Sequence, residues 1–147
     1  MFQNILCCID GSEHALRAAE QACVLAQKFG GSLTLLIVAK ELKPSAQVKR
    51  FIELEHLSGE PQYVLDEYTE DIMDKAKDVA AASGLTEVRT EIKTGNPARA
   101  IMEFAERRKV DTIVLGRRGM GDIEGVLLGS VSHKVASLAK CTVVTTR

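Results

Sequence analysis

Short apolar runs separated by helical stretches constrain the fold more than any other feature of this sequence. The runs are Asn4–Ile9, Ser32–Ala39 and Asp111–Leu115. A strand that is apolar at nearly every position is covered on both faces, as parallel strands are. The helix expected from the Ser12 cap to Phe29 carries an alanine stripe, typical of packing on a sheet, whose apolar positions are Ala15, Ala18, Ala19, Ala22, Ala26 and finally Phe29. This alternation predicts βαβ units with right-handed crossovers, and hence a parallel sheet with helices on both faces.

The rest of the chain continues the alternation. Residues 40–60 carry charges, Pro44 and Gly59 without a clean period, so we expect a long connection there. A helix is expected from Pro61 to about Ala82, with one apolar face formed by Leu65, Tyr68, Ile72, Ala76 and Val79. An edge strand is expected over Val88–Ile92, followed by a helix from the Asn96 cap and Pro97 to about Arg108. The last expected elements are a helix over Val131–Ala139 and a strand over Cys141–Thr145.

Composition bounds the possible classes of protein. The 147 residues suit one domain spanning 1–147. Nineteen basic and twenty acidic residues give a net charge of −1, and aromatics are 4%, so we expect no nucleic-acid partner. No apolar run approaches the ~18 residues of a membrane span, and the N-terminus lacks the positive charge of a signal peptide. Four cysteines without a C-x-x-C pair fit a reducing cytosol, so we expect a cytoplasmic protein without a membrane partner.

The polar chemistry lies where two strands end. Asp10, Gly11 and Ser12 follow the first strand, and a glycine-rich stretch over 116–130 follows the fourth. Ligands of open parallel sheets bind at the carboxyl ends of strands. Glycine amides, a helix start at Ser130 and the charge of Arg117 and Arg118 together suit a phosphate. The alternatives are an ordinary glycine-rich turn with a capping serine, and an Asx-type turn at Asp10.

The glycine spacing carries a family resemblance. The pattern Gly116-x2-Gly119-x9-Gly129-Ser130 resembles the nucleotide-binding signature of the ATP-binding universal stress proteins. The segments ILCCIDGSEHALRAAEQA, TGNPARAIMEFAERRKVDTIVLGRRGMG and GVLLGSVSHKVASLAKCTVV extend that resemblance over nearly the whole chain. It implies an α/β fold, a single-domain doubly wound five-stranded parallel sheet with strand order 3-2-1-4-5.

The resemblance also implies a ligand and a partner. ATP is expected as the cofactor with Mg²⁺ or Mn²⁺, and Asp10 as the metal ligand near the ribose and phosphates. The resemblance implies that Ile9 and Val38 flank the adenine. It implies that the phosphates bind to the backbone amides of Gly116, Gly119, Gly129, Ser130 and Val131. The other implied binding residues are Asp10, Gly11, Ser12 and Arg117. A homodimer through the strand Cys141–Thr145 would cover an exposed sheet edge.

Three functions stay open at this point. The first is a dimeric stress-response module that binds ATP and acts on an unidentified protein partner. The second is a slow ATPase or autokinase in the same pocket, although no side chain is placed as a catalytic base or nucleophile. The third is a nucleotide-independent interaction protein that works through its dimer and the 40–60 connection. The complete glycine–serine loop favours the first.

Overall fold

Five parallel strands form one sheet in the order β3-β2-β1-β4-β5 in the computed structural model, which describes residues 1–40, 61–120 and 127–147. The expected fold and strand order are therefore confirmed. The elements are β1 (Asn4–Ile9), α1 (Glu13–Phe29), β2 (Ser32–Ala39), α3 (Pro61–Ala82), β3 (Arg89–Thr94), α4 (Pro97–Arg107), β4 (Thr112–Gly116), α5 (Ser130–Leu138) and β5 (Thr142–Thr146).

Element bounds match the sequence predictions at the start of the chain and shift slightly later. The predicted edge strand at 88–92 lies instead at 89–94, and the predicted last strand at 141–145 lies at 142–146. The position of β3 at the sheet edge, paired with β2 alone, confirms the interpretation of its polar alternation. Nearly all of the predicted 40–60 connection lies outside the described residues.

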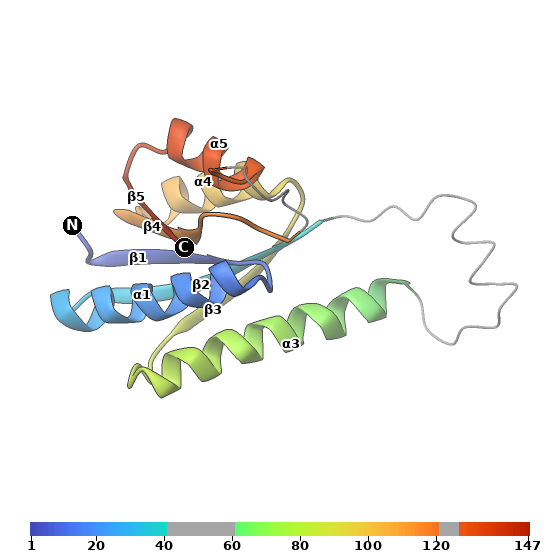
Figure 1. The fold of residues 1–147 in the computed structure, drawn as a ribbon, viewed down its shortest axis with the longest axis horizontal. Helices are drawn as coiled ribbons and strands as arrows, with labels where there is room; N and C mark the ends of the chain where they lie inside the picture. Colours follow the sequence, from blue (N-terminus) through green and yellow to red (C-terminus); the bar gives the residue numbers. More distant parts are fainter. Residues whose placement is uncertain (41–60, 121–126) are drawn as a thin grey trace, which may run out of the picture.

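Two helical layers cover the sheet, α1 and α3 on one face and α4 and α5 on the other (Figure 1). Strand alternation divides the core accordingly, since Cys7 belongs to the α1–α3 cluster and Cys8 packs against the α4–α5 cluster. Their packing in different clusters confirms the prediction that they face opposite sides of β1, and both are free thiols. No helix among the described residues is long and apolar enough to cross a membrane.

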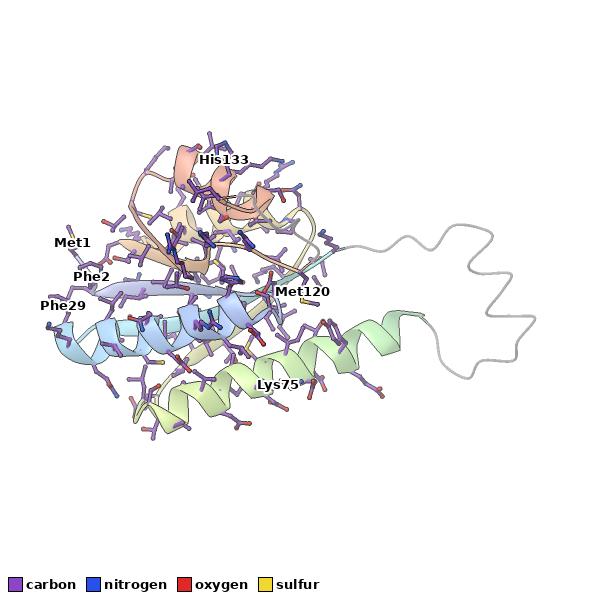
Figure 2. All side chains as sticks on the ribbon, viewed as in Figure 1. Met1, Phe2, Phe29, Lys75, Met120 and His133 are labelled. Carbon is purple, nitrogen blue, oxygen red and sulfur yellow. The ribbon has the colours of Figure 1, made fainter. Side chains whose placement is uncertain are left out.

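The alanine stripe lets α1 lie close on the sheet. Ser12 caps the start of α1, and Gly30 ends it in the left-handed conformation at φ 66°. The stripe's alanines are buried, but the prediction that Phe29 shares their burial is wrong, because its side chain is 44% exposed. Phe29 lies level with the residues before β1 and contacts Phe2 there, with ring centroids 4.9 Å apart (Figure 2).

The apolar face of α3 is only partly confirmed. Ile72 and Ala76 are buried in the core, as predicted. Tyr68, predicted on the same face, is 50% exposed, because it lies beyond the core near the start of α1. On the other layer, His133 is an exposed residue of α5 (Figure 2).

Candidate functional site

A cavity of about 340 Å³ opens at the carboxyl ends of β1, β2 and β4, between α3 and α5. Parallel strands bring their carboxyl ends to one edge, so ligand-binding groups from distant parts of the chain meet there. The predicted site residues that line this cavity are Ile9, Asp10, Val38, Gly116, Gly119, Ser130 and Val131. Gly11, Ser12, Arg117 and Gly129 do not line it.

Asp10 joins the two loops that border the cavity. Its Oδ1 accepts the Ser12 N–H at 2.9 Å and the Ser12 hydroxyl at 2.6 Å. Its Oδ2 accepts the Met120 N–H at 3.1 Å, across 110 positions of sequence. The Asx-type turn is therefore present. A carboxylate offers about four acceptor directions, so three bonds leave room for one more.

Gly11 and Ser12 support the site from behind. Gly11 has φ 86°, and a Cβ added there would come within 2.9 Å of Ile72 Cδ1. Ser12 accepts the Ala15 N–H at 3.1 Å and caps α1, where it is buried. Both residues fix the turn that presents Asp10.

Gly116 lies against α1. A Cβ on Gly116 would meet the His14 carbonyl carbon at 2.7 Å and the Ala15 nitrogen at 2.9 Å. These are backbone atoms of a packed helix, so only glycine fits without displacement. The first glycine of the signature therefore has a packing reason independent of any ligand.

Arg117 is held by backbone bonds on both sides. Its N–H donates to the Thr146 carbonyl at 2.7 Å, and its carbonyl accepts the Gly129 N–H at 2.8 Å. Desolvation, followed by the charges of Arg118 and Arg147, lowers the pKa of its guanidinium. The backbone of Arg117 thus fixes the start of the glycine-rich loop, while Arg118 is the arginine that lines the cavity.

The Gly129 amide is used within the protein. Because its N–H already bonds to Arg117, the predicted donation from this amide to phosphate does not fit the geometry. Gly129 precedes α5 as its cap residue, whereas Ser130 and Val131 are the first residues of the helix. Amides in the first turn of a helix have no intrahelical acceptor, and they carry partial positive charge. The loop amides whose geometry suits an anion are therefore those of Ser130 and Val131.

Sequence reasoning missed several residues. Ser132 is buried, and its hydroxyl lies 2.7 Å from the Arg117 carbonyl and 3.0 Å from the Gly129 carbonyl, so it ties the loop to α5. A serine two positions after the motif serine was the available signal. Arg118, whose charge the sequence suggested for a phosphate, lines the cavity, and the missed lining residues are Cys8, Ala15, Ile37, Ala39, Lys40, Tyr68, Thr69, Ile72, Pro97, Ile101, Leu115, Met120 and Ser132.

Few charged side chains line the cavity. Asp10 is the one carboxylate among the described lining residues, and Lys40 and Arg118 are its cations. Desolvation, with a contribution from Asp10, raises the pKa of Cys8 to about 12, so that thiol stays neutral. No cluster of three or more metal-ligating side chains occurs within the described ranges. A cation held here would draw on Asp10 and on oxygens of its ligand.

The fold and this cavity define a doubly wound α/β domain with a site at the strand-order switch. The model of the Universal stress protein family matches residues 1–147, and the chain belongs to that family. It is 32% identical to the universal stress protein YxiE of Bacillus subtilis and 38% identical to a universal stress protein of Thermus aquaticus. Both alignments cover the whole of each chain.

Solved structures agree with this assignment. Universal stress protein UspA from Lactobacillus plantarum superposes with a TM-score of 0.80 at 26% identity, covering 99% of this chain and 98% of that one. A universal stress protein in complex with cAMP gives 0.68 at 28% identity, with 99% and 97% coverage. An Archaeoglobus fulgidus member in complex with dAMP gives 0.69 at 17% identity, with 99% and 98% coverage, and supports the fold alone.

Proposed function

We propose that this protein is a stress-response module of the cytoplasm that binds Mg–ATP in the cavity at the strand ends. One observation carries the proposal: the start of α5 and the Asp10 carboxylate face the same cavity. The helix start supplies donors and partial positive charge for phosphates, and Asp10 supplies an oxygen for Mg²⁺. The related protein solved with cAMP supports an adenine nucleotide as the ligand.

The cavity lining combines polar and apolar groups. Ser130, Val131 and Arg118 offer a hydroxyl, helix-start amides and a positive charge suited to phosphates. Ile9 and Val38 offer apolar surface for the adenine, and the volume falls within the ~300–1,000 Å³ of small-molecule sites. The fourth acceptor direction of Asp10 is the one available to Mg²⁺.

Ser130→Asp tests the phosphate position. An acidic residue in the first turn of a helix favours folding, so the variant keeps its structure while it repels phosphate. At about 4 Å and an effective dielectric of ~20, one such repulsion reaches ~4 kcal/mol, so we expect calorimetric affinity for Mg–ATP to fall at least about tenfold. Thr86→Asp is the control, because it adds the same charge at an exposed position beyond α3. Equal affinities of both variants and the wild type would refute the proposal.

We also propose that two copies pair through β5. The Thr142 N–H and the Thr146 carbonyl bond toward β4, so by strand alternation the backbone groups of Val143 and Thr145 point away from the sheet. Thr145→Pro removes one outward donor, whereas Thr145→Val keeps it. Light scattering should show a dimer for the wild type and Thr145→Val, and a larger monomer fraction for Thr145→Pro. A monomeric wild type would exclude this pairing.

A further inference from the structure

A second hollow lies between α4 and α5, away from the carboxyl ends of the strands. Its volume is about 490 Å³, and it shares no lining residue with the cavity at the carboxyl ends of the strands, the proposed nucleotide cavity. We call it the α4–α5 groove. Both helices pack on the same face of the sheet (Figure 1).

The floor of the groove is apolar along its length. Ala98, Met102 and Ala105 lie at spacings of four and three on α4, hence on one side of that helix. Ile113 lies beneath them and is fully buried. Leu138 of α5 borders the same groove with 64% of its surface exposed. A continuous apolar strip beside an exposed leucine is a surface that an apolar ligand would cover.

The charges at the rim do not balance. Glu103 is paired with Arg99 at 2.7 Å, and Glu106 is paired with Lys140 at 3.1 Å. These pairs use both carboxylates of the groove.

Two further cations border the groove. Lys109 follows the end of α4, and Lys134 lies one turn before Leu138 on α5. Neither lysine forms an ion pair with a described residue. The uncompensated charge around the apolar floor is therefore positive.

Cys141 adds no negative charge to this lining. Burial, with a contribution from Asp111, raises the pKa of its thiol, so the thiol is protonated at neutral pH. An apolar floor with two lysine ammonium groups at its rim matches a molecule that carries an apolar chain and one anionic head.

We propose that the α4–α5 groove binds an amphipathic carboxylate of the fatty-acid class, with its chain on the Ala98–Met102–Ala105 strip and its carboxylate at Lys134 or Lys109. Chain burial supplies the affinity, and the lysines select an anionic head over a neutral or cationic one. This site is independent of the nucleotide proposal, because the two hollows share no residue.

Decanoate, below its micelle concentration, is the probe for this site. We expect it to shift backbone amide resonances of Met102, Leu138 and Cys141, and to leave those of Asp10 and Val131 unchanged. We expect affinity to fall from decanoate to decanol to decyltrimethylammonium. Decanoate shifts at the nucleotide cavity instead, or equal affinity for all three heads, would overturn the proposal.

Substitutions test the contacts of the ligand's apolar chain and of its anionic head separately. Lys109→Gln with Lys134→Gln should weaken decanoate about fivefold or more and change decanol less than about twofold, because each exposed charge contributes modestly. Lys28→Gln, at an exposed position on α1, is the matched control. Met102→Glu should abolish binding of both ligands. If decanoate does not bind and Leu138→Ser instead shifts the oligomeric state, the groove is a face between two copies and the proposal fails.

Discussion

Gly116→Ala tests whether the first glycine of the signature serves packing. The new Cβ would lie 2.7 Å from the His14 carbonyl carbon, 2.8 Å from the His14 Cβ and 2.9 Å from the Ala15 nitrogen. To reach ordinary contact at 3.4 Å, the nearest atom must retreat from 2.7 Å, a shift of about 0.7 Å. Ala15 and Ala18 are buried against the sheet, so α1 has little room for that shift.

The magnitude follows from this overlap. Overpacking of a rigid site costs about 1–3 kcal/mol. The new Cβ would overlap two backbone atoms and one Cβ of α1, none of which can rotate away, so this substitution lies near the upper end of that range. We therefore expect the free energy of unfolding to fall by about 2–3 kcal/mol, and Tm by about 5–10 °C for a chain of this size.

Urea unfolding followed by circular dichroism measures the effect. The midpoint should fall with the slope m unchanged, which marks a loss of stability without a change in the unfolded state. Gly30→Ala is the comparison, because a Cβ there meets nothing within 4 Å and the loss comes only from φ 66°, about 1 kcal/mol. A Gly116→Ala variant as stable as the wild type to within about 0.5 kcal/mol would refute the packing argument.

Two further substitutions test contacts that support the fold. Ser132→Ala removes the hydroxyl that ties α5 to the Arg117 carbonyl, so we expect a loss of about 1 kcal/mol in urea unfolding, and an equal stability to wild type would contradict this. Burial opposes ionisation of Asp111, but its bonds from Thr112, Asn4 and Gln3 outweigh burial and lower its pKa. The stability from this carboxylate is present above the ordinary pKa and is lost as pH falls below about 4 through the lowered value. Asp111→Asn should flatten that part of the profile of unfolding free energy against pH, and an unchanged profile would exclude the contribution.

The sheet was predictable because its strands are buried on both faces. The near-continuous apolar character of β2 is typical of a strand inside a parallel sheet. The polar alternation of β3 is typical of an edge strand. The strand order came from the family resemblance, since alternation alone does not choose among parallel topologies. The misplaced Phe29 shows the limit of periodicity: a residue can lie on the buried stripe and still project beyond the sheet.

The candidate site was predictable where polar or glycine residues directly follow the carboxyl end of a strand. Asp10 and Ser130 line one cavity because the carboxyl ends of parallel strands meet. Tyr68 was missed because helical periodicity places it on the apolar face of α3 but does not show which part of that face reaches the strand ends. Ser132 was missed because its partners are backbone carbonyls of a loop, so the sequence shows the serine but not the bonds that it makes.

Glycines at signature positions look alike in sequence, yet the structure gives them different tasks. Gly116 allows α1 to approach β4, and the Gly129 amide closes the loop onto Arg117. The close approach at 116 requires glycine, whereas the backbone N–H at 129 would be present in any residue except proline, so only the distances separate the two roles. Stability and ligand affinity should therefore be separable in this loop: substitution of Gly116 acts mainly on unfolding, whereas substitution of Ser130 acts mainly on binding.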